Sequence, residues 1–331
     1  MSEKKKIGIV LFQLGGPDTL KAVEPFLYNL FCDPDIINFP GAWLARKPLA
    51  KWIAVRRSKV VAEHYAAIGG GSPIRQLTED QARALEDALR PHVNARAVVA
   101  MRYWHPFTAE AIAQLEGMHL DELILLPLYP QYSFATTASS LKEWGRLYRP
   151  NSSLPVRTIQ IFYDHPLYIA ALAEKINLGL AHVRHPEGVF LVFSAHGLPI
   201  SLIERGDPYQ RQIEETVRLV REFGDWPNSH VLCYQSRVGR QKWLEPSLTH
   251  TIERLAKGGV KRMLVIPVSF VTEHIETLHE INIEAREEAE ALGVEEFAVM
   301  PALNDSPKFI AALADLVLRA VRVESTAVAA S

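Results

Sequence analysis

An apolar strand that runs into a helix rich in acidic residues is the part of this sequence best suited to chemistry. Residues 263–270 read MLVIPVSF, the pattern of a buried strand. Acidic residues then recur at intervals of four, which on an α-helix places them one above another on a single face. They are Glu276, Glu280, Glu284 and Glu288. Like charges at this spacing destabilise an isolated helix by roughly a few tenths of a kcal/mol per pair. A bound cation would offset that repulsion, so the pattern points to metal handling.

A solvated acidic face is the alternative interpretation of the same residues. The helix dipole favours carboxylates in a first turn, and Thr272 is a residue type that caps helix N-termini. Position favours the metal interpretation, because His274 and Glu276 follow the carboxyl end of an apolar strand. Open α/β sheets place their ligand sites at that end. Both interpretations stay open on these residues alone.

A second reactive group follows another apolar strand. His196 lies in SAHGLP (194–199), directly after the run 189–193, and Gly197 would allow a sharp backbone turn behind it. A neutral imidazole accepts a proton near pH 7 or binds a divalent metal. Among the 12 histidines, we expect five on the surface or in packing, namely His64, His92, His182, His185 and His250. His196 instead stands at the predicted ligand edge of the sheet.

Length and composition exclude several classes of protein. The chain has 331 residues, 48% hydrophobic and 22% charged, which is typical of a globular protein of one large or two ordinary domains. A net charge of −2 argues against nucleic acid as a partner. The two cysteines, Cys32 and Cys233, form no disulfide framework and fit a reducing compartment. Since no apolar run has the length of a signal peptide or a membrane span, we expect a cytoplasmic protein.

Apolar strands alternate with amphipathic segments along the whole chain. This order is typical of βαβ units and predicts an α/β fold with doubly wound, mainly parallel sheets. The expected strands are Ile7–Leu14, Ala95–Met101, Glu122–Leu128, Val156–Phe162, Val189–Ser194, His230–Tyr234, Met263–Phe270 and Phe297–Pro301.

The strand pattern repeats, which predicts two similar four-stranded halves. VLFQLGGP at 10–17 and VFSAHGLP at 192–199 are each a strand, a polar turn, then Gly and Pro. A cluster of Pro, Asn and Ser near 149–156 marks the break. We expect residues 1–150 with a C-terminal helix in 305–331 to form the first half, and residues 151–304 to form the second. A central cleft between the halves is the default ligand site.

Two further segments have sequence patterns that indicate a binding role less specifically. GAWLARKPLAKWIAVRRSK at 41–59 interleaves apolar and basic residues, so the stretch Trp43–Arg57 would lie on an anionic membrane, line a pocket mouth or simply pack on the core. GGGSP at 69–73 would cradle an anion through its amides and Ser72, but it lacks the Lys of a phosphate-binding loop.

Taken together, the motifs resemble ferrochelatase, the family that inserts ferrous iron into a porphyrin in heme biosynthesis. SAHGLP with a distant HIETLHE is the most specific combination, and the motifs follow the family order across nearly the whole chain. The motifs are QLGGP (13–17), IGGGSP (68–73), MRYWHP (101–106), YPQYS (129–133), SAHGLP (194–199), RGDPY (205–209), YQSRVG (234–239), Trp243 and FVTEHIETLHE (270–280).

The resemblance implies roles for individual residues. His196 and Glu276 would form the central catalytic and metal-binding pair, with further metal ligands at Glu273, His274, Glu280 and Glu284. The macrocycle pocket would be lined by Leu14, Tyr103, Tyr129, Trp243 and Phe270, with propionate contacts from Arg57, Ser72 and Ser236 and with Arg102 nearby. In the expected mechanism the pocket presses the porphyrin out of plane while His196 accepts pyrrole protons.

The resemblance also carries expectations about cofactors and substrate. Some members bind a [2Fe-2S] cluster through cysteines in the YPQYS segment and the C-terminal tail, and this chain has cysteine in neither. Leu14-Gly15-Gly16-Pro17, in place of the Tyr-Gly-Thr-Pro of the coproporphyrin branch, favours protoporphyrin IX over coproporphyrin III. We therefore expect no permanently bound cofactor, with Fe(2+) and protoporphyrin IX as substrates.

Other functions remain open on sequence alone. A chelatase for another tetrapyrrole, with cobalt or nickel, is the nearest rival. A non-catalytic metal- or heme-binding protein would need no proton acceptor opposite the acids. A metallohydrolase built on His196, His274 and Glu276 is disfavoured because the chain lacks compact zinc-ligand spacing such as His-Glu-x-x-His.

Overall fold

The computed structural model describes residues 4–34, 42–149, 154–236 and 241–327. The chain separates into two compact units, each with its own sheet. The first unit comprises residues 1–129, 134–162 and 304–331, and the second comprises residues 130–133 and 163–303. The expected boundary at residue 150 differs from this division. Strand β4 (Val156–Thr158) pairs in parallel with β3 (Glu122–Pro127), which places it in the first sheet.

The first sheet consists of four parallel strands in the order β2-β1-β3-β4. β1 (Lys6–Gln13) lies between β2 (Asn94–Met101) and β3, and every residue of β1 after Lys6 is buried. Because such a strand is covered on both faces, it has no polar alternate positions. This explains the continuous apolar run IGIVLF at residues 7–12.

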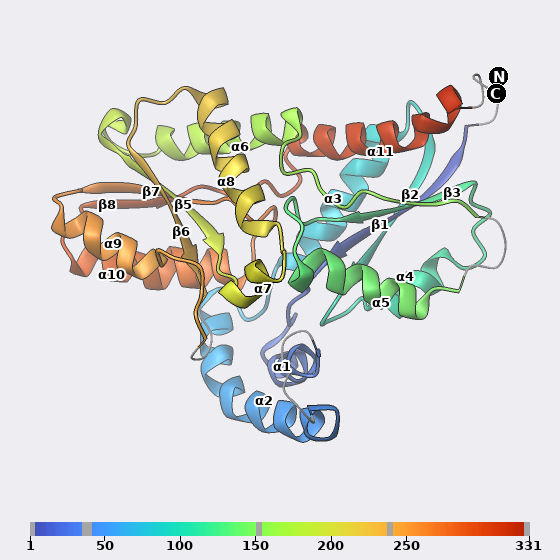
Figure 1. Cartoon of the computed structure of the whole chain (residues 1–331), viewed down its shortest axis with the longest axis horizontal. Coiled ribbons are helices and arrows are strands. Elements are labelled where there is room, and N and C mark those ends of the chain that lie inside the picture. The colour runs from blue at the N-terminus through green and yellow to red at the C-terminus, as the bar shows by residue number, and fades with distance from the viewer. Residues whose placement is uncertain (1–3, 35–41, 150–153, 237–240, 328–331) are drawn as a thin grey trace. The chain divides into compact units, whose positions relative to one another are not determined.

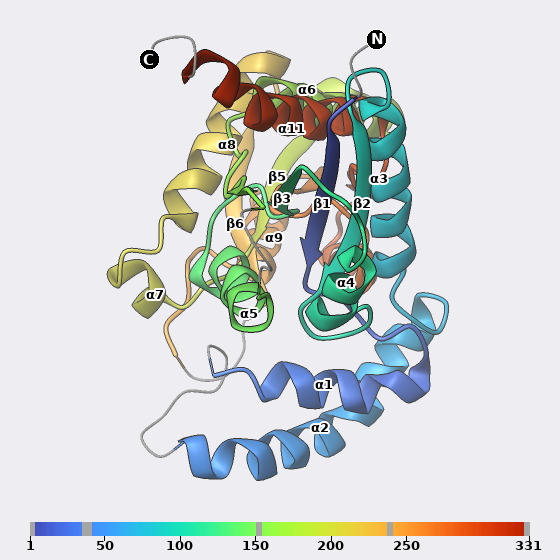
Figure 2. The same cartoon turned by 90° about the vertical axis from the view of Figure 1, so that its right-hand side faces the viewer.

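Helices cover both faces of the first sheet. α3 (Ile74–Leu89) packs with α11 (Pro307–Ala327), the red helix of Figure 1. Side chains of α4 (Thr108–Leu115) and α5 (Ser139–Leu147) join those of β1 to β3 in a buried cluster. The unit also contains η1 (Leu20–Ala22), α1 (Val23–Phe31), α2 (Ala42–Ala67) and the π-helix η2 (Phe134–Ala138), and α1 packs beside α2 (Figure 2).

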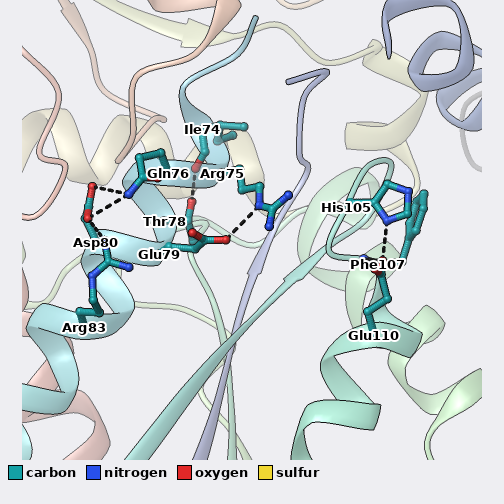
Figure 3. Close-up of polar contacts among 10 residues, drawn as sticks. All are labelled: Ile74, Arg75, Gln76, Thr78, Glu79, Asp80, Arg83, His105, Phe107 and Glu110. Atoms are coloured by element: carbon teal, nitrogen blue, oxygen red, sulfur yellow. Dashed lines mark hydrogen bonds and ion pairs between the residues drawn. The ribbon is translucent and has the colours of Figure 1, made fainter. Parts of the chain in front are cut away.

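Local side-chain bonds fix two of these helices. On α3, the Thr78 hydroxyl donates to the carbonyl of Ile74 (2.6 Å), and Arg75 pairs with Glu79 (Figure 3). At the start of α4, the carboxylate of Glu110 accepts the Phe107 amide at 2.6 Å and lies 2.7 Å from Nδ1 of His105. The histidine of the MRYWHP motif is thus engaged at a helix start.

The second sheet repeats the arrangement of the first. Its parallel strands are β5 (Phe190–His196), β6 (His230–Gln235), β7 (Arg262–Pro267) and β8 (Glu296–Val299), in the order β6-β5-β7-β8. In each sheet the first strand of the unit lies between the second and the third. The predicted fold class, two similar doubly wound parallel sheets, is confirmed.

Helices also cover both faces of the second sheet (Figure 1). α6 (Pro166–Ala181) packs with α8 (Tyr209–Gly224) on one face. α9 (Leu248–Lys257), η4 (Glu276–Ala285) and α10 (Arg286–Ala291) supply side chains to the buried cluster on the other. The remaining elements are η3 (Pro186–Gly188) and α7 (Ile200–Glu204).

All eight expected strands are present, but several end earlier than expected. The structure ends β4 at Thr158, β7 at Pro267 and β8 at Val299. β4 pairs on one side only, and edge strands are commonly short. β7 ends where Val268 and Ser269 turn the chain toward η4. In the described part of the chain, no helix has the length and apolar character needed to cross a bilayer.

Candidate active site

The centre of the candidate site is a histidine–glutamate pair in the second unit. His196 is the last residue of β5, and Glu276 is the first residue of η4, which follows β7. Nδ1 of His196 lies 2.8 Å from Oε2 of Glu276. β5 and β7 are parallel neighbours, so their carboxyl ends meet at one edge of the sheet. The two side chains keep 36% and 23% of their surface exposed, which leaves them open to a substrate.

The two groups stabilise each other's charged form. Burial acts to lower the pKa of His196, but the negative charge and hydrogen bond of Glu276 outweigh it, and the pKa is raised above its ordinary value. Burial acts to raise the pKa of Glu276, but the His196 charge and hydrogen bond hold it well below the usual range. The pair therefore stabilises an imidazolium beside a carboxylate, which is the state that His196 reaches once it has taken up a proton.

Glu280 is the third member of this centre. Its carboxylate accepts the Ser236 amide at 2.7 Å and the Ser236 hydroxyl at 2.5 Å. Burial, followed by the negative charge of Glu276, raises the pKa of Glu280 to about 7. Ser236 was expected to contact a propionate. Here its amide donates to Glu280, and its hydroxyl lies 2.5 Å from Glu280 and 3.4 Å from Oε2 of Glu276.

The buried side-chain amide of Gln235 contacts the glutamate of this pair. Gln235, the last residue of β6, accepts the Ser194 hydroxyl at 2.7 Å and donates to Oε2 of Glu276 at 3.4 Å. Gly197 lies against the same strand, since a Cβ at Gly197 would be 2.7 Å from the carbonyl oxygen of Gln235. Close approach to β6, rather than the sharp turn expected from the sequence, requires this glycine.

Three more of the predicted site residues, Phe270, Glu273 and His274, lie in the segment between β7 and η4. Phe270 places its ring 6.3 Å from that of His196 and 4.4 Å from that of His274. Nδ1 of His274 lies 2.9 Å from the carbonyl oxygen of Thr272, so a neutral His274 would keep the lone pair of Nε2 for a ligand. Glu273 accepts the Ala302 amide at 2.9 Å and the Thr277 hydroxyl.

Two expectations about this helix start are wrong. Thr272 does not cap the helix, because η4 begins at Glu276. The acidic residues do not form one continuous α-helical stripe, because residues 276–285 form a π-helix and Glu288 belongs to α10. In the wider π-helical turn Glu276 and Glu280 converge on Ser236. Glu284 is exposed and lies 3.5 Å from Nδ1 of His279.

The arrangement is more open than a structural metal centre. Within the described residues, no three of the six predicted ligands have donor atoms all within 4.8 Å of one another. Carboxylate oxygens and a histidine are nevertheless ligands that ferrous iron accepts. An ion that must move on to a second molecule is better served by such an incomplete set.

The predicted residues of the first unit lie around the ends of β1 and β2. The Arg102 amide donates to Gln13 O at 2.8 Å and the Tyr103 amide to Leu14 O at 2.9 Å, so the MRYWHP and QLGGP segments are joined. Asp33 accepts the Arg102 guanidinium at 2.7 Å and the Tyr103 hydroxyl at 2.8 Å. Asp33 has 3% exposure and was not predicted from the sequence, because its partners lie far along the chain.

The other residues predicted to contact the porphyrin lie on several different elements of the two units. Ser72 is buried beside Gly16, and its amide donates to Pro17 O at 2.7 Å. Arg57 is exposed on α2, with its guanidinium 5.7 Å from the ring centroid of Phe31. Tyr129 is buried, and its hydroxyl lies 3.4 Å from that of Ser140. In the second unit, the Trp243 ring packs against Gly197. Residues 237–239 of the YQSRVG motif and the side chain of Trp43 are outside the described residues.

Comparison with known proteins identifies the family. The family model described as ferrochelatase matches residues 6–321. The chain belongs to the ferrochelatase family. It is 50% identical to the ferrochelatase of Thermosynechococcus vestitus, over 95% of this chain and 82% of that one. It is 51% identical to the ferrochelatase of Geotalea uraniireducens, over 97% of this chain and 99% of that one.

Two solved structures share the fold of this ferrochelatase. SirB from Bacillus subtilis with Fe³⁺ superposes with a TM-score of 0.59 at 11% identity, covering 97% of this chain and 98% of that chain. CbiX, the terminal enzyme of siroheme biosynthesis in denitrifying bacteria, gives 0.50 at 14% identity, covering 96% and 99%. At these identities the likeness supports the chelatase-like fold alone.

Family membership decides between the classes that the sequence left open. A ferrochelatase is a metal-insertion enzyme of heme biosynthesis whose substrates are a porphyrin and iron. The metallohydrolase and the non-catalytic binding protein are therefore set aside.

Proposed function

We propose that this ferrochelatase inserts Fe(2+) into protoporphyrin IX and forms protoheme, with His196 and Glu276 at the reaction centre. The observation that carries the proposal is the 2.8 Å contact between Nδ1 of His196 and Oε2 of Glu276 at the carboxyl edge of the second sheet. Insertion releases two pyrrole protons, so the reaction needs a base that functions beside a metal-binding carboxylate.

His196 is suited to be that base. With Nδ1 engaged by Glu276, Nε2 is the atom that accepts a pyrrole proton, and the resulting imidazolium is stabilised by the neighbouring carboxylate. The same contact fixes the direction of Nε2. The second proton would leave through a second transfer, for which Glu280 is suited because its pKa is raised to about 7 by burial and by the charge of Glu276.

Glu276 and Glu280 are suited to hold iron briefly before transfer. Hard oxygen ligands bind ferrous iron more weakly than thiolates do, and weak binding favours release to the macrocycle nitrogens. We include His274 in this set through Nε2, with Glu273 and Glu284 as outer carboxylates. The anchoring of Glu273 by Ala302 and Thr277 supports a positioning role for that residue.

The ring contacts belong to the same proposal. Phe270 and Trp243 flank His196 and Gly197, which supports their assignment to the macrocycle pocket. On the basis of family resemblance we also propose macrocycle contacts for Leu14, Tyr103 and Tyr129 of the first unit. The same resemblance proposes propionate contacts for Arg57, Ser72 and Ser236, with Arg102 nearby. Distortion of the porphyrin in this pocket would expose nitrogen lone pairs, at a strain of about 1–5 kcal/mol drawn from binding energy.

Local packing supports the choice of protoporphyrin IX. The coproporphyrin branch has Thr where this chain has Gly16, and a Cβ at Gly16 would lie 2.6 Å from Cβ of Ser72. A Thr side chain therefore does not fit beside Ser72 in this unit. The QLGGP loop and the GGGSP loop are matched to each other in the form that resembles the protoporphyrin branch.

Anaerobic insertion assays test the proposal. Protein is mixed with ferrous iron and either protoporphyrin IX or coproporphyrin III, and the porphyrin absorbance bands are followed. We expect catalytic turnover of protoporphyrin IX, and loss of most turnover in His196→Ala and in Glu276→Gln with unchanged far-UV circular dichroism. Wild-type turnover in either variant would refute the assignment of that residue, and preference for coproporphyrin III would refute the substrate branch.

Peripheral membrane contact through α2 is the second part of the proposal. Trp52 is 60% exposed and Val55 is 51% exposed, beside the exposed basic residues Lys51, Arg56 and Arg57. Ala50 and Ala54 are fully buried and lie on the packed side of α2. The exposed Trp52 and Val55 are therefore not needed for packing of the helix. Such a surface favours an anionic bilayer, which also dissolves protoporphyrin.

Vesicle sedimentation tests this contact. We expect binding to phosphatidylglycerol vesicles that weakens with salt and is reduced in Trp52→Ser, and little binding to phosphatidylcholine vesicles. Equal sedimentation of wild type and Trp52→Ser would refute the contact. The expected location is cytoplasmic, with this face on the membrane.

We further propose that no [2Fe-2S] cluster is bound. Cys233 is buried on strand β6 of the second unit, and Cys32 lies in the first unit, so two cysteines supply half of the ligands that such a cluster usually takes. Acid-labile sulfide analysis of the purified protein should find none. Stoichiometric sulfide with a brown chromophore would overturn this expectation.

A further inference from the structure

The backbone of His196 is held by side chains on both of its polar groups. The His196 amide donates to Oγ of Ser269 at 3.0 Å, and its carbonyl accepts the hydroxyl of Tyr209 at 3.1 Å. The register between β5 and β7 ends at Ser194, two residues before His196. Side-chain contacts from Ser269 and Tyr209 therefore continue the support of the strand where the pairing with β7 has ended.

Tyr209 is itself fixed by a buried carboxylate. Oδ1 of Asp207 accepts the Tyr209 amide at 3.0 Å, and Oδ2 accepts the Ser133 hydroxyl at 2.9 Å. Tyr209, Asp207 and Ser133 are 6%, 4% and 1% exposed. Tyr209 is also the first residue of α8, whose buried side chains include Ile213, Val217 and Val220. The direction of the phenol is thus determined by the start of a packed helix.

The hydroxyl of Tyr209 is not needed to fill space. A phenylalanine has nearly the same volume and would pack in the same position, so the hydroxyl matters for the bonds that it makes to the His196 carbonyl and to Ser269. The bond to the carbonyl orients the peptide between His196 and Gly197. The orientation of this peptide in turn sets the Cα–Cβ direction of His196, and with it the direction of Nε2.

We infer that Tyr209 is a positioning residue for metal insertion, which acts through its hydrogen bond to the His196 carbonyl and is held in place by Asp207 and Ser133. The inference rests on the proposed role of His196 as the proton acceptor. Misplacement of a reacting group by about 1 Å can lower a rate by about a hundredfold, so the expected effect is on turnover and not on porphyrin binding.

The chain offers a matched control. Tyr168 is fully buried in the same unit, and its hydroxyl donates to the carbonyl of Val268 at 3.3 Å. Tyr168→Phe therefore removes a buried tyrosine hydroxyl from a backbone carbonyl without touching His196. Both substitutions remove a tyrosine hydroxyl donor from a backbone carbonyl, so we expect a similar lowering of the unfolding midpoint in either case.

The experiment compares Tyr209→Phe, Tyr168→Phe and His196→Ala for kcat, for KM of protoporphyrin IX and for the midpoint of thermal unfolding. We expect Tyr209→Phe to lower kcat by about 10- to 100-fold with KM unchanged, and Tyr168→Phe to keep kcat at a similar loss of stability. Asp207→Asn, which weakens the anchor of Tyr209, should lower kcat to an intermediate degree.

The possible failures can be distinguished. Wild-type kcat in Tyr209→Phe together with an inactive His196→Ala would overturn the role of Tyr209 and leave the proposed function intact. Full activity in His196→Ala would overturn the proposed function itself. Equal loss of kcat in Tyr209→Phe and Tyr168→Phe would make the contribution of Tyr209 purely structural. If Tyr209→Phe does not fold, unchanged kcat in a folded Asp207→Asn would overturn the inference.

Discussion

Ser236 holds Glu280 with two hydrogen bonds, one from its amide at 2.7 Å and one from its hydroxyl at 2.5 Å. Ser236 has a φ of 62°, in the left-handed region that favours glycine. Residues in this conformation cost about 1–3 kcal/mol and persist where the surroundings determine them. The bidentate contact to Glu280 is such a determinant, so the position of the carboxylate and the strained backbone are linked.

Substitutions at Ser236 should separate the two effects. Ser236→Ala loses the hydroxyl bond and keeps the strain, whereas Ser236→Gly loses the bond and relieves the strain. We expect both variants to bind divalent metal more weakly, because Glu280 loses a donor that favours its ionised form. We expect Ser236→Gly to be the more stable of the two by up to about 1 kcal/mol. Urea unfolding and metal titration would measure this. A more stable Ser236→Ala would contradict the strain.

The raised pKa of Glu280 makes the stability of the fold depend on pH. Since burial and the charge of Glu276 raise this pKa to about 7, folding favours the protonated form. The free energy of unfolding that protonated Glu280 contributes is fully present below the ordinary pKa of a glutamate. It is lost as the pH rises through about 7.

Glu280→Gln should remove this contribution. Between pH 5 and 8, the unfolding midpoint of the wild type should fall relative to that of Glu280→Gln, because the amide cannot ionise. Glu287→Gln in α10 is the control, since Glu287 is exposed, and it should keep the wild-type dependence. Thermal unfolding across this pH range is the measurement. Parallel curves for wild type and Glu280→Gln would show that Glu280 does not titrate there.

Gly197→Ala should impair the site more than the fold. Its Cβ would lie 2.7 Å from the carbonyl oxygen of Gln235, so β5 and β6 must separate at His196. Overpacking of this kind costs about 1–3 kcal/mol. We expect a folded protein with strongly reduced kcat. Gly145→Ala in α5 is the control, because a Cβ there meets nothing within 4 Å. Comparable activity in both variants would mean that the close approach at Gly197 is not critical.

Thr277→Val should weaken the start of η4. The Thr277 hydroxyl accepts the His274 amide at 3.1 Å and donates to Glu273, and the residue is 2% exposed. Valine fills the same space without these bonds and leaves buried polar groups unsatisfied, at a cost of about 1–3 kcal/mol. Urea unfolding would measure the loss. We expect porphyrin affinity to stay near that of the wild type, and a fully stable variant would contradict the importance of the bonds.

The strands and the duplicated arrangement could be predicted because their signal is local. Buried parallel strands are short apolar runs, and VLFQLGGP and VFSAHGLP show the same order of strand, turn, Gly and Pro in both halves. His196 and Glu276 could be selected because each follows such a run, and parallel pairing of β5 with β7 brings the two ends together.

The supporting contacts could not be predicted because they join distant parts of the chain. The Ser236 bonds to Glu280 and the Tyr209 bond to His196 depend on where whole elements pack, although Ser236 and Tyr209 stand in recognised motifs. Asp33 lies in a segment without a chemical pattern. The π-helix was missed because spacing by four residues is the ordinary sign of an α-helix, and the hydrogen-bond pattern that widens the turn leaves no trace in residue type.

The π-helix from Glu276 to Ala285 has a consequence for protein engineering. Thermostable variants are commonly made by introducing strong α-helix formers and by trimming irregular turns. In this stretch such changes would favour the tighter α-helical turn and rotate Glu280 away from Ser236. A more heat-resistant protein obtained in this way would be a poorer catalyst, so selection for stability alone should leave these ten residues unchanged.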